Sequence, residues 1–330
     1  MNIIEELVVE QEPDENLKKA ELENGFYNIV DGEKISTSKR LSVNHGATNK
    51  QLATVPDVEH ALLAIAISVA RNAFSGWEAV PFARRKAILA TLLKKVDDHA
   101  GELSALLAAE QGVTLTEARW EINALTKAFG PALLQMEPPE KEQNVQPAKH
   151  ITKRYIPIDA SGTVSSRNLP VILSFGKALP SLLAGDTLVL RPSRFTALTV
   201  LRIAEHIREL LPPGVFNVVT GGDDFWPGMT SHSGIDLISF TRSANIENPA
   251  LESVAGTLEL GESDSRAITD PERIALLGSV ALVPLIRRPG RYGLARTLFE
   301  IFSFRPGCMK TQVLLWSLAR RASDSLPSCR

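Results

Sequence analysis

The sequence has few of the features that mark secreted, membrane-spanning or nucleic-acid-binding proteins. Among its 330 residues are only two cysteines, Cys308 and Cys329, which is too few for a disulfide framework and predicts a free thiol. No stretch approaches the roughly 18 uninterrupted apolar residues that a transmembrane helix requires. The net charge of -2 gives no reason to expect nucleic acid or an anionic membrane as a partner.

The N-terminus also lacks the basic, apolar and small-residue order of a signal peptide, so a cytoplasmic location is expected. The composition, 44% hydrophobic and 22% charged, is ordinary for a folded protein. The charge is nevertheless uneven along the chain. Residues 1–24 carry eight acidic residues and two lysines, whereas residues 284–330 carry nine Lys and Arg against two acidic residues. We interpret the first segment as a solvated appendage and the second as a basic tail.

The stretch from Tyr155 to Gly261 is the part in which strand, helix and turn signals alternate regularly. An apolar run that ends before Pro192 is followed by an amphipathic helix and by a second apolar run, Val215 to Thr220. About 30 residues separate the starts of these runs, the usual size of a right-handed crossover between parallel strands. Because the runs are apolar rather than alternating, both faces of the sheet are expected to be covered. The prediction is an α/β fold with a Rossmann-like parallel sheet and helices on both faces.

The carboxyl ends of the predicted strands are the expected site of ligand binding, because sheets of this kind bind ligands beyond those ends. The structure is therefore expected to bring five short segments to one edge. They are Ser165 to Asn168, Arg191 to Arg194, Thr220 to Gly222, Phe240 to Ser243 and Leu258 to Gly261.

A helical lead-in is expected before the sheet. Asp57 is the predicted cap of the first helix, Thr114 and Glu117 fit a capping box at the fourth, and Arg84 and Arg85 fall on the polar face of the second. The expected elements are helices from Asp57 to Trp77, after Pro81, from Gly101 to Gln111 and from Thr116 to Phe129, followed by a linker at Pro138 and an exposed strand from Ile151 to Pro157.

Six segments, in order and at nearly the same spacing, resemble the aldehyde dehydrogenase superfamily over about residues 40 to 270. The Asn-Leu-Pro segment is similar to that family's Trp-Asn-Phe-Pro, and the Pro-Pro-Gly-Val-Phe-Asn-Val-Val run is similar to its Pro-Pro-Gly-Val-x-Asn-x-Val. The segments are the lead-in with Phe74 to Trp77 and Arg84 to Leu89, then Asn168 to Pro170, Lys177 to Thr187, Pro212 to Val219, Ser239 to Thr241 and Leu258 to Gly261.

The resemblance implies oxidation of a small-molecule aldehyde by NAD or NADP through a cysteine thioester. Asn168 matches the asparagine whose side-chain amide donates to the oxyanion, and Glu259 matches the carboxylate that activates water against the thioester. Without the resemblance, an Asn before Leu-Pro is most often a turn residue. No metal ligands are predicted. The residues expected to contact the cofactor are Ser166, Arg191, Ser193, Phe240, Thr241 and Ser243.

The chain departs from the family at the position of the cofactor phosphates. The family has Gly-x-x-x-x-Gly after its Phe-Thr strand end, and this chain has Arg242 and Glu247 at the two glycine positions. A side chain obstructs the close approach that glycine permits, and a carboxylate repels an anion. Only 16 residues separate Phe240 from Thr257, which shortens the crossover helix. Arg191 stands where the family has a ribose-contacting lysine. We therefore expect NAD to bind weakly or not at all.

The nucleophile also departs from the family pattern. The family motif Asn-x-Gly-Gln-x-Cys has no counterpart after Glu259, which leaves Cys308 as the candidate nucleophile, with an inert buried cysteine as the alternative. The expected catalytic domain is absent or replaced, so the activity is expected to be impaired. A non-catalytic relative, kept as the partner of a full-length homologue or as a decaying gene product, is the alternative function.

These features divide the chain into five segments, and the chain is expected to form a homo-oligomer or an oligomer with a homologue. The segments are an acidic appendage (1–39), the helical part of the cofactor-binding domain (40–135), a linker and exposed strand arm (136–158), the Rossmann-like core (159–260), and a truncated catalytic domain with the basic tail (261–330).

Overall fold

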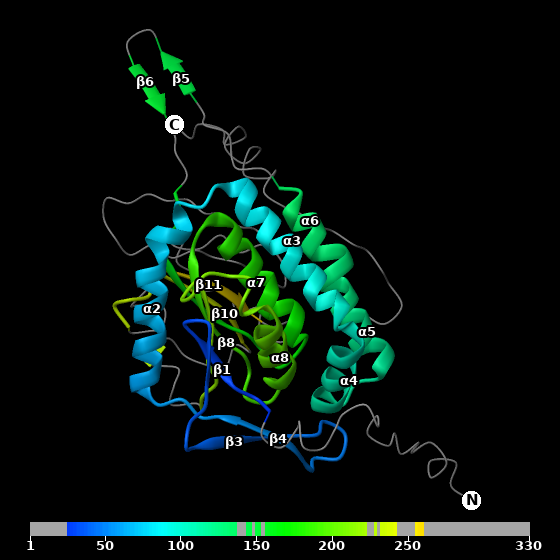
Figure 1. Cartoon of the computed structure of the whole chain (residues 1–330). Coiled ribbons are helices and arrows are strands. Elements are labelled where there is room, and N and C mark those ends of the chain that lie inside the picture. Colours follow the sequence, from blue (N-terminus) through cyan, green and yellow to red (C-terminus); the bar gives the residue numbers. More distant parts are fainter. Residues whose placement is uncertain are drawn as a thin grey trace, which may run out of the picture.

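The computed structural model describes residues 25–136, 143–146, 149–152, 156–222, 228–229, 232–242 and 255–260. Its centre is a seven-stranded sheet flanked by helices (Figure 1). In spatial order the strands are β11 (Ala255–Leu260), β10 (Leu237–Arg242), β7 (Ala160–Val164), β8 (Thr187–Arg191), β9 (Phe216–Val218), β1 (Asn28–Val30) and β2 (Glu33–Ile35).

The five strands from β7 to β11 are all parallel, as the sequence predicts. The chain runs outward from β7 through β8 to β9, then returns to the other side of β7 and continues through β10 to β11. This is the strand order of dinucleotide-binding sheets, in which the direction of winding reverses at one point. Here the reversal lies between β7 and β10.

Helices cover both faces of this sheet, which confirms the predicted layers. Leu188 and Leu190 of β8 belong to the core with α7 (Pro170–Ala184) and α8 (Leu198–Ile207). Val189, between them, belongs to the core with α2 (His60–Glu78). Because side chains alternate across a strand, one apolar run serves both cores.

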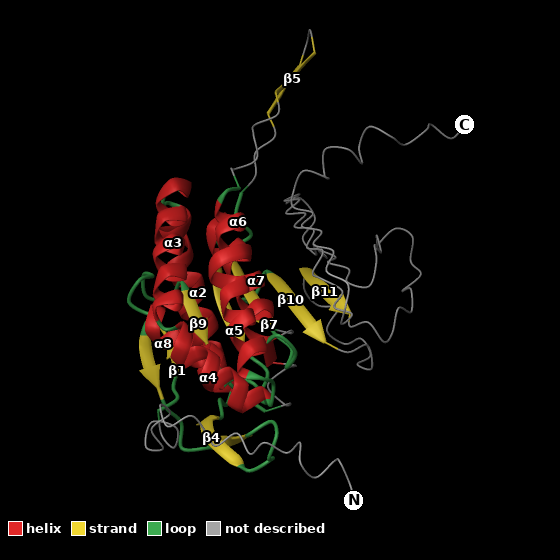
Figure 2. Cartoon of the chain, turned by 90° about the vertical axis from the view of Figure 1, so that its right-hand side faces the viewer, coloured by secondary structure: helices red, strands yellow, loops and turns green. Residues whose placement is uncertain are grey.

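Further helices form an outer layer over α7 and α8 (Figures 1 and 2). The capping box at Thr114 and Glu117 is present, with both reciprocal hydrogen bonds formed. The expected cap at Asp57 is wrong, because the helix starts after Glu59 and the Asp57 carboxylate instead accepts from the Gly222 amide at 3.1 Å. The outer elements are α3 (Phe82–Asp98), α4 (Ala100–Gln111), α5 (Leu115–Asn123), the π-helix η1 (Ala124–Phe129) and α6 (Gly130–Leu134).

The N-terminal segments differ from expectation. Residues 28–35, expected within the appendage, form β1 and β2, and β1 pairs antiparallel with β9 at Ile29 and Val218. Ahead of the helices, β3 (Arg40–Asn44) and β4 (Gln51–Pro56) form a hairpin. Strands of three residues carry too few side chains for a periodic signal, so their pairing depends on contacts distant in sequence. The division into domains stays a prediction.

A second hairpin, β5 (Gln143–Gln146) with β6 (Lys149–Thr152), projects from the body of the protein (Figures 1 and 2). The exposed strand arm was expected to begin at Ile151, and the structure adds a partner strand in the expected linker.

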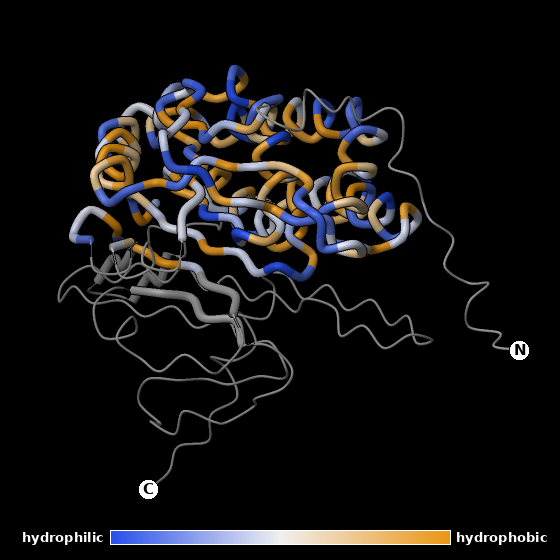
Figure 3. The backbone as a smooth tube through the Cα atoms, turned by 90° about the horizontal axis from the view of Figure 1, so that it is seen from below, coloured by the Kyte–Doolittle hydropathy of each residue, from blue (hydrophilic) through white to orange (hydrophobic). Residues whose placement is uncertain are grey.

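Along the tube in Figure 3, hydrophobic and hydrophilic segments alternate in the helices. Among the described residues, no helix is both long and apolar enough to cross a bilayer.

Arg85 is buried, contrary to its expected place on a polar helix face. Its guanidinium donates to the carbonyls of Leu183 (3.0 Å) and Ala184 (3.2 Å) at the end of α7, and to Glu78 (3.3 Å) at the end of α2. The last carbonyls of a helix have no partner within the helix. Arg85 supplies one, and thereby joins three helices at the amino edge of the sheet.

Replacing Arg85 with lysine is expected to lower the free energy of unfolding by about 2 to 4 kcal/mol, because a single ammonium leaves several buried carbonyls unpaired. Urea denaturation measures this quantity. The control is Arg84→Lys at the neighbouring exposed position, expected to stay within about 0.5 kcal/mol of the parent protein. Equal stability of the two variants would contradict the role assigned to Arg85.

Candidate functional site

The register of the parallel strands aligns the predicted site residues at one edge of the sheet. Val164 is paired with Arg191 on β8 and with Phe240 on β10, and Phe240 is paired with Leu258 on β11. Thr241 and Glu259 are paired one residue further along. Because all four strands are parallel, the chain leaves each of them just beyond this row, at a common carboxyl edge. The winding reverses inside this row, between β7 and β10.

Ser166 and Asn168 lie in the loop between β7 and α7, at that edge. The Ser166 hydroxyl donates to the Asn168 carbonyl at 3.1 Å, and the Gln111 amide donates to the Arg167 carbonyl at 2.8 Å. Leu169 has a φ of 48°, a conformation that costs free energy for a branched residue. Gln111 thus ties the loop to the end of α4, and the Asn168 side chain is exposed.

Two buried glutamates cap the helices that start at this edge. The Glu121 carboxylate accepts from the amides of Val171 (2.8 Å) and Ile172 (3.1 Å) at the start of α7. The Glu110 carboxylate accepts in the same way from Leu198 (2.8 Å) and Thr199 (3.0 Å) at the start of α8. Burial raises the pKa of each glutamate to about 7, although these hydrogen bonds oppose the rise.

These caps decide where a phosphate group can bind. A helix N-terminus attracts anions through its free amides and its dipole. At α7 and α8 a carboxylate from within the protein already occupies the first amides, and at α7 Leu173 is bonded to the Leu169 carbonyl. Neither terminus is open to a phosphate. Two further connections leave this edge, one after β9 and one after β10, and residues 223–227, 230–231 and 243–254 within them lie outside the described residues.

The end of β8 contributes the other predicted cofactor contacts. Arg191 is buried, and its Nη2 donates to the carbonyls of Gly221 and Gly222, both at 2.8 Å. Ser193, two residues on, accepts through its carbonyl from the Thr196 amide at 3.1 Å. Arg191 therefore joins the end of β8 to the segment after β9.

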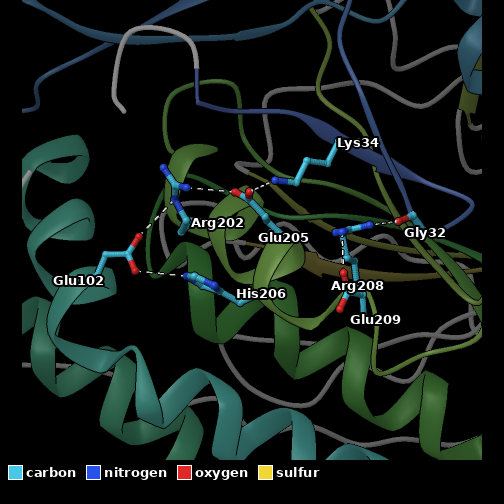
Figure 4. A network of polar contacts seen from close by, with 8 residues as sticks. All are labelled: Gly32, Lys34, Glu102, Arg202, Glu205, His206, Arg208 and Glu209. Carbon is cyan, nitrogen blue, oxygen red and sulfur yellow. Dashed lines mark hydrogen bonds and ion pairs between the residues drawn. The ribbon is translucent and has the colours of Figure 1, made fainter. Parts of the chain in front are cut away.

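A network of charged side chains fixes α8 behind this loop (Figure 4). Glu102 of α4 pairs with Arg202 (3.3 Å) and His206 (3.2 Å), and Arg202 pairs with Glu205 at 3.1 Å. Lys34 of β2 pairs with Glu205 from the other side. Since Glu110 and Glu102 both belong to α4, this one helix holds the start and the flank of α8.

The structure thus brings most of the predicted site residues to a common edge. Asn168 follows β7 and Glu259 lies on β11, and both are at the carboxyl ends of strands adjacent to β10. The side chains of Phe240, Thr241 and Glu259 are not among those described. Ser243, Glu247 and Cys308 lie outside the described residues altogether.

Three predicted cofactor contacts lie at the edge where open α/β sheets bind their ligands. Ser166 follows β7, which borders the reversal point, and Arg191 and Ser193 lie at the end of β8, one strand away. The glutamate caps were not predicted as functional residues. The sequence feature that could have revealed them is an acidic residue among the apolar residues of a helix. Glu110, for example, follows a run of buried residues in α4.

Comparisons with known proteins agree on one family. The model of the "Aldehyde dehydrogenase family" matches residues 31–270. A chloroplastic aminoaldehyde dehydrogenase of Arabidopsis thaliana is 31% identical over 229 residues, which are 65% of this chain and 46% of that protein. A solved NADP-dependent enzyme of E. coli is 27% identical, with a TM-score of 0.67 over 74% of this chain and 53% of that one.

A second solved structure adds a ligand complex. It is an aldehyde dehydrogenase C variant from Pseudomonas syringae with NAD+ and octanal, 26% identical, with a TM-score of 0.63 over 72% of this chain and 50% of that one. The chain spans about half the length of the curated relatives it matches.

The two caps predict a pH-dependent stability. Because the folded pKa of about 7 lies above the ordinary glutamate value of 4.5, the folded protein binds more protons between these values, and its free energy of unfolding falls as pH rises through them. Between pH 5 and 7.5, the free energy of unfolding of Glu110→Gln or of Glu121→Gln should therefore fall by about 1 to 3 kcal/mol less than that of the parent protein.

Urea denaturation across that pH range measures the effect. Glu117→Gln is the matched control, because Glu117 is an exposed cap whose pKa is lowered by its bonds to Thr114 and which titrates below the range. Identical slopes in the parent protein and both buried-cap variants would contradict the assignment.

Proposed function

Because the chain belongs to the aldehyde dehydrogenase family, we propose that it is an oxidoreductase that oxidises an aldehyde to a carboxylic acid with NAD or NADP, with impaired activity in the chain by itself. The observation that supports this most is the strand order, in which β7, just before Asn168, and β11, which contains Glu259, lie on either side of β10. The dinucleotide would lie across that edge and accept a hydride from the substrate.

The proposed roles follow the chemistry of a thioester route. The Cys308 thiolate attacks the aldehyde carbon, and the Asn168 side-chain amide donates to the oxygen that becomes negative. Loss of hydride leaves a thioester. The Glu259 carboxylate removes a proton from water, which attacks the thioester and releases the acid and the thiol. Ser166, Arg191 and Ser193, with Phe240, Thr241 and Ser243, would hold the dinucleotide.

The proposed partners are a small-molecule aldehyde and a second chain, either a copy or a homologue. The projecting β5–β6 hairpin supports the second, since within the described part of the chain each of its strands pairs only with the other. We propose a cytoplasmic location. The curated relatives carry chloroplastic and peroxisomal in their names.

A non-catalytic relative is the second candidate, and the sequence after β10 favours it. Arg242 ends β10 where the family has a glycine. The termini of α7 and α8 are already capped by carboxylates, so the segment after β10 matters more for phosphate binding, and a side chain there weakens that binding. The two candidates differ in nucleotide binding.

NAD is expected to bind the purified chain with a dissociation constant of roughly 100 μM or weaker, because Arg242 and Glu247 replace the glycines of the phosphate motif. Calorimetric titration measures it. A micromolar constant would refute this expectation, whereas no heat at millimolar NAD or NADP favours the non-catalytic candidate.

The chain by itself is expected to reduce no NAD or NADP in the presence of aldehydes, since the family's cysteine motif has no counterpart. Absorbance at the nicotinamide band measures turnover. Turnover that is lost in both Cys308→Ala and Glu259→Gln would overturn this expectation and establish Cys308 as the nucleophile. Cys329→Ala is the matched control, because it removes the other thiol.

A further inference from the structure

Two histidines from different layers of the protein stack against each other beside the charged network of Figure 4. His99 lies between α3 and α4, and His206 lies in the last turn of α8. Their ring centroids are 3.8 Å apart, and the ring planes are inclined by 28°. In Figure 4 the His206 ring points toward Glu102 of α4. The His99–His206 pair therefore joins the outer helical layer to α8.

Hydrogen bonds fix which nitrogen of each ring can take a proton. His99 Nδ1 lies 2.9 Å from the carbonyl oxygen of Lys95, and His206 Nε2 lies 3.2 Å from a carboxylate oxygen of Glu102. Both oxygens accept, so each of these nitrogens is the donor of its ring. The second nitrogen of each ring can then take a proton, which gives that ring a full positive charge.

The charges of the network balance while both rings are neutral. Lys34 and Arg202 supply two positive charges, and Glu102 and Glu205 supply two negative charges. The other charged groups nearby are Lys94 paired with Asp98, Lys127 paired with Asp97, Arg208 paired with Glu209, and the exposed Lys95. One proton on each ring therefore changes the charge of the network from zero to two positive charges.

Glu102 is the carboxylate that contacts the pair among the described residues. The hydrogen bond from His206 is the main cause that lowers the pKa of the Glu102 carboxyl, so this group is ionised at neutral pH. It also pairs with Arg202 at 3.3 Å. One carboxylate that is already shared with a guanidinium cannot neutralise two charged imidazoles. Two like charges about 4 Å apart in a half-buried setting repel strongly enough to shift an equilibrium by about tenfold.

We infer that the His99–His206 pair is an acid-sensitive contact, which loosens the hold of the outer layer on the second half of α8 when both rings are charged, below about pH 6. Unfolding separates the rings, and each then takes its proton without opposition. The unfolded state therefore binds more protons in this range, and the contact loses stability as pH falls. The inference does not depend on the proposed function.

The two ends of α8 thus respond to acid in opposite ways. Glu110, near the end of α4, caps the start of α8, and that cap loses stability as pH rises. Glu102 and His99, at the start of α4, contact the end of α8. Acid is therefore expected to strengthen the attachment of one end of α8 and to weaken that of the other.

The test is hydrogen exchange of the full chain, measured by mass spectrometry at about pH 7.5 and pH 5 and corrected for the intrinsic rates. The readout is the protection of the amides of residues 203–207. His99→Gln keeps a donor for the Lys95 carbonyl but takes no proton. We expect its protection to lie within about threefold of the parent protein at the higher pH and to exceed that of the parent by about tenfold at the lower pH.

His206→Gln is the second variant, because its amide can still donate to Glu102. It should gain protection at the lower pH as well, and the double variant should gain no more than the better single variant, since the repulsion requires both rings. Glu110 and Glu121 are present in every variant, so their contribution cancels in the comparison with the parent.

His60→Gln is the matched control. It removes an exposed histidine at the start of α2, a helix that packs on the other face of the sheet from α8. Its protection should follow that of the parent at both pH values. A ratio of variant to parent that is the same at both pH values in both single variants would overturn the inference, as would an equal gain of protection in His60→Gln.

Discussion

The contact between α4, α5 and the first turns of α7 and α8 is the constraint on which the carboxyl edge depends. Two buried carboxylates, those of Glu110 and Glu121, satisfy amides that a helix start cannot satisfy internally. Above their pKa of about 7, the negative charge of these groups also offsets the positive end of each helix dipole. The same bonds that fasten the two helices to the outer layer therefore remove two anion sites from the edge of the sheet.

This arrangement shifts ligand binding toward side chains and toward the connections after β9 and β10. A dinucleotide carries its negative charge on phosphates, and two helix termini that could have met it are occupied. The cations at the edge then matter more. Arg191 is one of them, and its guanidinium donates to the carbonyls of Gly221 and Gly222, so it joins the end of β8 to the segment after β9.

The sequence predicts the elements of the sheet well because each one is a local pattern. The apolar run before Pro192 and the helix after it are visible without any knowledge of their neighbours. The strand order is different in kind, since no local pattern tells that β10 returns to the far side of β7. The burial of Arg85 is hidden for the same reason, because two of its carbonyl partners, those of Leu183 and Ala184, are 98 and 99 residues away in the sequence. The short strands β1 and β2 are not predicted, because three residues are too few to show the alternation of apolar and polar side chains that marks a strand.

The site was predictable only as a set of positions. The family resemblance gives Asn168 and Glu259, and the register brings both to one edge across β10. Yet a position at the correct edge is not a working group, because fold does not imply function. The segments that match the family are those that hold the sheet together, whereas Arg242 and Glu247 fall where the family approaches its ligand. Stability and ligand binding can therefore change independently in this chain, and only binding measurements report on its chemistry.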